Sequence, residues 1–188
     1  MRKTFSTQRI ESGFALLLTL IIVSVVLAIG LSILDTTLKQ VVLSGTGRDS
    51  EKSFHAAYAG AECGQNSRLN DLYTDAIVNS DGNPSITCLG GSQSVDSSLH
   101  TNVSGGRVHR LTYDITWGPS NETCTNFDLY LFDSRTTSGD ATYNIPGLGS
   151  KTCVDGALCT LIASRGYNRA CNDLTSQRAV QREVVVQY

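Results

Sequence analysis

The sequence has no excess of basic residues. Its 188 residues include 15 Lys and Arg against 17 Asp and Glu, which gives a formal net charge of −2 at pH 7. A protein that binds nucleic acid is expected to present a basic face to the phosphate backbone. The charge balance therefore provides no evidence for a nucleic-acid partner.

Motifs for catalysis and metal binding are also missing. The chain contains no Gly-x-Ser-x-Gly nucleophile elbow, no P-loop and no dinucleotide-binding glycine loop. The nearest cysteine pair, Cys153 and Cys159, is spaced too widely for a zinc motif. Residues 79–83 place oxygen ligands around a glycine but lack the distal glutamate of a calcium loop, so we interpret them as a plain turn. The three histidines are each isolated in sequence: His55, His100 and His109. We therefore expect no enzyme activity, no cofactor and no metal site.

Charged side chains are absent from one long segment, residues 14–34, which also lacks His, Asn and Gln. As a helix its 21 residues would be roughly 31 Å long, which matches a bilayer hydrocarbon core of about 30 Å. The preceding residues 1–13 carry three basic side chains against one acidic. The positive-inside rule then keeps this flank in the cytoplasm. The segment predicts a single-pass protein of the cytoplasmic membrane with its C-terminus outside.

A cleavable secretory signal is the main alternative interpretation of this segment. Such a signal has an apolar core of about 7–15 residues followed by a small-residue cleavage site. Here the apolar stretch is longer and continues into helix-like sequence. We therefore favour a membrane anchor.

The residues that follow, 35–70, continue the helical pattern. Phe54, Ala57, Tyr58 and Ala61 recur at i, i+3, i+4 and i+7, the spacing of one helix face. We expect the stripe through Phe54 and Tyr58 to pack against a globular domain. Two glycines within residues 44–47 each cost about 1 kcal/mol relative to alanine in a helix, so bending or local melting is expected there. The pattern predicts one helix from Phe14 to about Leu69.

Strand-like runs separated by turn residues follow, in residues 71–188. Arg107–Trp117 alternates clearly and places Tyr113 and Trp117 together on what we expect to be the core face. Three further runs are strand candidates: Phe127–Phe132, Cys159–Ser164 and Arg178–Gln187. The pattern predicts an α+β fold in which an antiparallel sheet packs on the second half of the long helix.

Six cysteines lie after the apolar segment: Cys63, Cys88, Cys124, Cys153, Cys159 and Cys171. Their even number and their position indicate disulfides formed in an oxidising compartment outside the membrane. Six cysteines allow 15 pairings, and the sequence does not choose among them. Our preference is for Cys63 with a loop cysteine such as Cys88, and for a second cluster made by Cys153, Cys159 and Cys171.

The segment Arg9–Leu20 combines a short basic leader, a glycine at position 13 and a phenylalanine that opens the apolar helix. Ser53–Glu62 is rich in alanine and helical in pattern, and weaker similarity returns at Ile162–Tyr167 and Arg178–Tyr188. In these segments the chain resembles the type IV pilins and related pseudopilins, and most of all the minor pilins of the PilX kind.

This resemblance implies a pilin-like fold and a maturation pathway. A prepilin peptidase would cut between Gly13 and Phe14 and the new amino terminus of Phe14 would be methylated. The chain would then consist of a prepilin leader (1–13), a transmembrane helix segment (14–34), a helix continuation (35–70) and a disulfide-rich β head domain (71–188). The implied partners are other pilin subunits, the prepilin peptidase, the pilus assembly platform and membrane lipid, and the implied final location is a cell-surface filament.

One position departs from the family pattern. Major pilins carry a glutamate as the fifth residue after cleavage, and this position is Leu18 here. A carboxylate within the membrane is costly and persists where it has a partner and a function. Its absence favours a minor subunit at the tip or in priming over a bulk shaft subunit. Two alternatives remain: a membrane-anchored extracytoplasmic binding module that does not polymerise, and a pseudopilin of a type II secretion system.

Overall fold

A computed structural model describes residues 11–70, 82–135 and 138–188. The chain divides into two compact units, Met1–Gly47 and Arg48–Tyr188, each of which is described by itself. Most of the leader, residues 1–10, and most of the turn predicted at 79–83 lie outside the described ranges.

Helix α1 comprises Glu11–Leu69, which agrees with the predicted end of the helix near Leu69. The helix continues through residues 44–47, so the prediction of local melting at the two glycines is wrong. A glycine penalty of about 1 kcal/mol is small beside the hydrogen bonds that flanking helix supplies on both sides.

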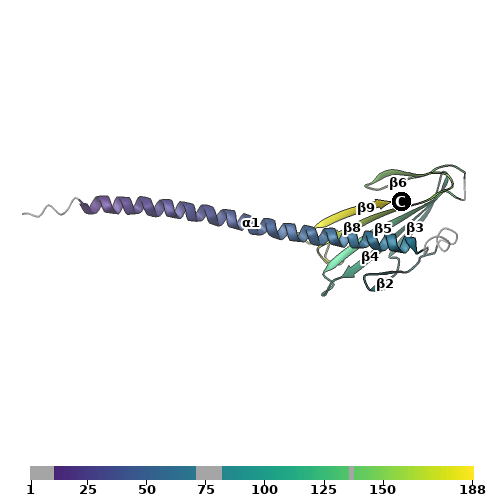
Figure 1. Cartoon of the computed structure of the whole chain (residues 1–188), viewed down its shortest axis with the longest axis horizontal. Coiled ribbons are helices and arrows are strands. Elements are labelled where there is room, and N and C mark those ends of the chain that lie inside the picture. The colour runs from purple at the N-terminus through teal and green to yellow at the C-terminus, as the bar shows by residue number, and fades with distance from the viewer. Residues whose placement is uncertain (1–10, 71–81, 136–137) are drawn as a thin grey trace, which may run out of the picture. The chain divides into compact units, whose positions relative to one another are not determined.

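The second unit contains an antiparallel sheet of five strands in the order β3-β4-β5-β8-β9, together with the hairpins β1-β2 and β6-β7 (Figure 1). The strands are β1 (Ile86–Cys88), β2 (Gly91–Gln93), β3 (Ser97–Val103), β4 (Gly106–Trp117), β5 (Thr123–Asp133), β6 (Ala141–Ile145), β7 (Gly149–Cys153), β8 (Leu158–Tyr167) and β9 (Gln181–Gln187). The long apolar helix and this sheet confirm the α+β class. The predicted strands at 127–132 and 159–164 lie inside the longer β5 and β8.

Strand β4 shows the alternation that its sequence predicts. Leu111, Tyr113 and Ile115 are buried on the face toward α1, whereas Asp114 and Thr116 on the other face are exposed. Tyr113 is fully buried and Trp117, on the same face, is half-buried against the core. Both aromatic residues therefore belong to the core side, as expected.

Strand β9 begins at Gln181, three residues later than the predicted Arg178. The side chain of Asn168 explains the difference, because its Nδ2 donates to the Arg178 carbonyl at 3.1 Å and its Oδ1 accepts from the Val180 amide at 2.7 Å. Side-chain hydrogen bonds thus replace the strand ladder before Gln181.

The face of α1 that packs on the sheet is made of small residues. Its members are Ser53, Ala56, Ala57, Gly60, Ala61 and Gly64. A Cβ atom at Gly60 would lie 2.3 Å from Thr125 Cγ2, and one at Gly166 in β8 would lie 2.1 Å from the Ala57 nitrogen. The helix backbone therefore lies directly against β5 and β8.

The prediction that Phe54 and Tyr58 pack against the globular domain is wrong. Their side chains are 49% and 50% exposed and stack on one another, with ring centroids 6.4 Å apart. A helix that approaches a sheet this closely has no room for an aromatic ring at the contact. Periodicity identified the helix correctly, but residue size determined which face packs.

Hydrogen bonds reinforce this contact. The Thr125 hydroxyl donates to the Ala56 carbonyl at 2.9 Å and accepts from Trp117 Nε1 at 2.9 Å. The Ser53 hydroxyl donates to the carbonyl of Val180 at 2.7 Å. The part of α1 around Ser53 and Ala56 is therefore fixed to the sheet by polar as well as apolar contacts.

Two hydrophobic clusters lie on opposite faces of the sheet. The first, toward α1, includes Leu111, Phe127 and Ile162, together with Ile86 of β1. The second is covered by the β6-β7 hairpin, and its members are Val108, Tyr130, Phe132, Ala141, Ile145, Cys153, Leu161 and Ala163. The hairpin covers part of the outer face and leaves the Asp114 end of the sheet exposed.

Candidate functional site

The predicted processing residues Gly13 and Phe14 lie in the first turn of α1, which begins at Glu11. Both are exposed, Phe14 to 70% of its surface, and a Cβ built at Gly13 would meet nothing within 4 Å apart from its chain neighbours and the adjacent helix backbone. Both residues at the predicted cleavage site are therefore exposed in the described structure.

Every side chain from Phe14 to Leu34 is exposed in the structure. Within the described residues, α1 is long and apolar enough to cross a membrane. Two of its hydroxyl groups are satisfied within the helix, because Thr19 donates to the Leu16 carbonyl at 2.9 Å and Ser24 to the Ile21 carbonyl at 2.8 Å. These two local bonds reduce the polarity that the segment presents to a hydrocarbon environment.

All six cysteines form disulfides. Cys63 of α1 bonds to Cys88 of β1, which is the pairing preferred from the sequence. Cys153 bonds to Cys159, and Cys171 bonds to Cys124 of β5 rather than joining these two cysteines. The C-terminal cluster was therefore predicted only in part, because the register of β5 beside β8 brings Cys124 close to the loop that follows β8.

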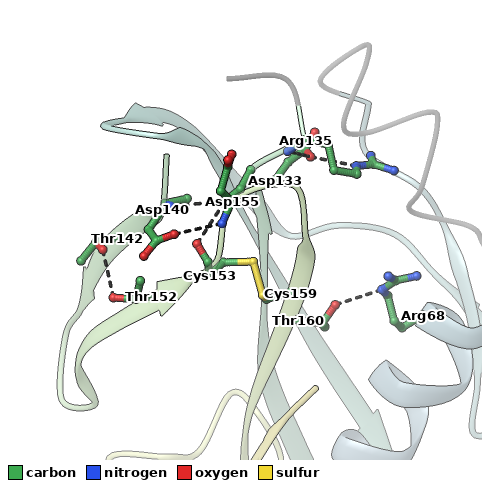
Figure 2. The surroundings of a disulfide bond; sticks show 12 residues. Arg68, Asp133, Arg135, Asp140, Thr142, Thr152, Cys153, Asp155, Cys159 and Thr160 are labelled. Atoms are coloured by element: carbon green, nitrogen blue, oxygen red, sulfur yellow. Dashed lines mark hydrogen bonds and ion pairs between the residues drawn. A yellow bond between two sulfur atoms is a disulfide. The ribbon is translucent and has the colours of Figure 1, made fainter. Parts of the chain in front are cut away.

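The Cys153–Cys159 disulfide joins the end of β7 to the start of β8 (Figure 2). In the adjoining loops, the Asp155 amide donates to Asp140 Oδ1 at 3.0 Å and Asp155 Oδ1 accepts from the Gly139 amide at 3.1 Å. The two hydrogen bonds hold the ends of the β6-β7 hairpin together, and the disulfide ties the end of β7 to β8 of the sheet.

A buried carboxylate on the outer face of the sheet was not found by sequence reasoning. Asp128 of β5 is 3% exposed, and its Oδ1 accepts from Arg110 Nε at 3.0 Å, Arg110 Nη2 at 2.9 Å and the Thr112 hydroxyl at 2.6 Å. Its Oδ2 accepts from Arg165 Nη2 of β8. The alternation of β4 placed Arg110 and Thr112 on this face, but the carboxylate that they share with Arg165 of β8 comes from β5.

Arg110 is held on a second side by an aromatic ring. Its Cζ lies 5.8 Å from the centroid of Tyr130, a cation–π contact. Burial acts to lower the pKa of Arg110, but the charge and hydrogen bonds of Asp128 outweigh burial and raise that pKa above its ordinary value. The same side chain is therefore charged and fixed in place.

Next to these residues lies a cleft of about 110 Å³. Its floor contains Asp128, Arg110 and Arg165, and its wall is formed by Ile145, Pro146 and Leu148 at the turn of the β6-β7 hairpin. Glu183 of β9 also lines it. The cleft thus combines a charged floor with an apolar wall.

The structure brings together two of the three histidines. His100 and His109 face each other across β3 and β4, with their Nδ1 atoms 2.6 Å apart, and His109 is fully buried. His55 is exposed on α1, with Nε2 3.7 Å from Glu51 Oε1, as expected of a surface histidine. In the described part of the chain, no group of three or more His, Cys, Asp or Glu side chains is arranged to hold a metal ion.

No family model, curated protein or solved structure matches this chain. The functional argument therefore depends on the residues and contacts described above.

Proposed function

We propose that the chain is a structural subunit of a type IV pilus or a related filament, a minor pilin that acts at the tip or in priming and has no enzymatic activity. The observation that carries this proposal is the arrangement at the start of α1. An exposed Gly13–Phe14 junction leads directly into an uncharged helical segment, residues 14–34, whose side chains are all exposed. The same helix continues into the packed head.

An exposed apolar helix requires a second environment. An apolar surface of this extent marks a membrane or protein contact. Lipid provides that environment before assembly, and the helices of neighbouring pilin subunits provide it afterwards. The proposal therefore includes membrane lipid, other pilins, the assembly platform and the prepilin peptidase as partners.

The head is suited to the outside of the cell. Its three disulfides form and persist in an oxidising compartment. With residues 1–13 in the cytoplasm, the head lies on the opposite side of the membrane. The proposed location is the cytoplasmic membrane first and a surface filament after assembly.

Leu18 supports a tip or priming role over a shaft role. The resemblance to pilins assigns this position to a glutamate that pairs with a neighbouring amino terminus, and leucine makes no such pair. The same residue keeps two other functions open, a tethered module that never polymerises and a pseudopilin of a type II secretion system. Both are distinguished by the experiment below.

The test is intact mass with N-terminal peptide mapping of the chain from membranes and from sheared surface filaments of its native host. We expect a mature chain that begins at N-methylated Phe14 and occurs in the sheared fraction. Gly13→Val should retain the full leader, whereas Gly30→Val, a matched change inside the apolar segment, should still be processed.

Processing of Gly13→Val to the same shorter chain would remove the main support for the pilin proposal. A native chain that still begins at Met1 and stays in the membrane fraction would identify a tethered module. Processed protein that is found with a secretion apparatus and not in pili would favour the pseudopilin.

A further inference from the structure

The two arginines on the outer face of the sheet are held in place by one buried carboxylate. Asp128 accepts hydrogen bonds from both Arg110 and Arg165, and Thr112 donates to it as well. Burying the Asp128 carboxylate and partly burying two arginines is costly, and apolar replacement of such groups is often neutral or stabilising. Because the network lines a cleft, recognition of a ligand explains it better than stability does.

Each guanidinium group keeps donor capacity for a ligand. Arg110 uses Nε and Nη2, and Arg165 uses Nη2, in their contacts with Asp128. Neither Nη1 atom makes a hydrogen bond to any part of the chain that the structure describes. A fixed guanidinium loses little conformational entropy when it binds, so these donors are preorganised.

Glu183 supplies acceptors beside these donors. It lies opposite Arg165 in the register of β8 and β9, it is exposed, and it forms no ion pair with any residue that the structure describes. The two arginines, Asp128 and Glu183 together carry no net charge. A simple anion therefore gains little Coulomb energy in this cleft, which argues against a phosphate or carboxylate ligand.

A hydroxyl group is both a hydrogen-bond donor and an acceptor. Fixed donors next to a carboxylate therefore complement a ligand that carries several hydroxyl groups. The wall of Ile145, Pro146 and Leu148 offers an apolar surface to the carbon–hydrogen face of such a ligand. The volume of about 110 Å³ is below the roughly 300–1,000 Å³ of pockets for drug-sized ligands, so the cleft suits a single terminal unit.

We propose that this cleft binds one uncharged sugar unit, whose hydroxyl groups accept hydrogen bonds from Arg110 and Arg165 and donate a hydrogen bond to Glu183. The proposal does not depend on assembly into a filament, because a tethered head would present the same cleft. It assigns a recognition role to an extracytoplasmic head.

The test is saturation-transfer-difference NMR on the full chain in detergent micelles. The probes are glucose, galactose, mannose and N-acetylglucosamine, with sodium acetate and sodium glucuronate as anionic probes. We expect at least one neutral sugar to bind with a dissociation constant in the millimolar range. Glu183→Gln should raise the dissociation constant of that sugar by about tenfold or more, because hydrogen bonds to charged groups are stronger than those between neutral groups.

Glu62→Gln is the matched control, because Glu62 is exposed on α1 and does not line the cleft. Glu183→Gln leaves the Asp128 network intact, so loss of binding in this variant would not reflect unfolding. Arg165→Lys should also weaken the sugar by about tenfold, because lysine does not reproduce the planar donor fork.

Three results would overturn the proposal. They are binding of none of the neutral sugars, binding of acetate or glucuronate alone, and sugar binding that Glu183→Gln and Glu62→Gln leave equally unchanged. Each of these results is independent of whether the leader is cleaved at Gly13.

Discussion

Two stretches of α1, residues 14–34 and residues 53–64, are both helical but differ in the size and exposure of their side chains. Residues 14–34 are mostly large aliphatic side chains, and all of them are exposed. Residues 53–64 place serine, alanine and glycine on the face that is buried against the sheet. The side chains of the first stretch have no packing partner in the described part of the chain. Those of the second stretch pack against the chain's own strands.

This difference teaches that hydrophobicity and packing are separate properties of a helix face. The face that packs is not the most apolar one, since Phe54 and Tyr58 remain half-exposed. Close contact between helix and sheet requires small side chains, and dispersion together with hydrogen bonds from side-chain hydroxyls to backbone carbonyls then replaces large apolar area. Four changes test this comparison, from the largest expected effect to the smallest.

The largest effect is expected from removing the disulfide that anchors the packed stretch. Cys63 and Cys88 are 25 residues apart, so the chain-entropy model gives a loss of about 3.5 kcal/mol for Cys63→Ala with Cys88→Ala. Denaturant unfolding of the full chain in micelles measures it. Cys153→Ala with Cys159→Ala, a separation of 6, should cost about 2 kcal/mol, and the reverse order would contradict this account.

The next effect is expected at Gly166, where β8 contacts the helix backbone. A Cβ atom there would lie 2.1 Å from both the Ala57 nitrogen and the Ser53 carbonyl oxygen. Backbone atoms on both sides cannot move independently, so Gly166→Ala should reduce the free energy of unfolding by about 3 kcal/mol. A loss below about 1 kcal/mol in the same unfolding experiment would show that the helix and sheet are less closely packed than described.

The same substitution should change stability in opposite directions in the packed stretch and in the exposed part of α1 that precedes it. At Gly60 a Cβ would meet Thr125 Cγ2 at 2.3 Å and Ser164 Oγ at 2.4 Å, whereas at Gly45 nothing lies within 4 Å. Gly60→Ala should destabilise by about 1–2 kcal/mol, after a helix-propensity gain of about 1 kcal/mol. Gly45→Ala should keep that gain, and circular dichroism at the helix band would show it. Equal signs for the two variants would contradict the comparison.

The smallest effect is expected at the exposed aromatic pair. Phe54→Ala removes a ring that is half-exposed. This ring stacks on Tyr58 and touches His55 edge-on, and both of these side chains are also exposed. Its effect on the free energy of unfolding should stay within about 0.5 kcal/mol, as for other surface changes. A loss of 2 kcal/mol or more would restore the original prediction that this stripe belongs to the core.

Local patterns predicted the features that depend on local sequence. The apolar segment 14–34, the end of the helix at Leu69 and the alternation of β4 follow from composition and periodicity over a few turns or one strand. The Cys63–Cys88 pairing was also anticipated. These predictions did not require knowledge of which strands lie side by side.

Features that depend on long-range pairing were missed. Asp128 meets Arg110 across 18 residues and Arg165 across 37, and this contact exists because β5 lies between β4 and β8. His100 and His109 were considered isolated, yet the register of β3 and β4 places them opposite each other. Pairing and register depend on the global fold, which single-sequence patterns leave undetermined.

The Cys63–Cys88 bridge also has a mechanical consequence. Tension applied along the chain passes directly from the helix to β1 through the covalent bond, and the residues between the two cysteines carry none of it. Fully extended, that intervening chain would add roughly 80 Å to the length of the molecule. The disulfide keeps this length out of reach, so a pulled chain transmits force from α1 to β1 through a short, inextensible link.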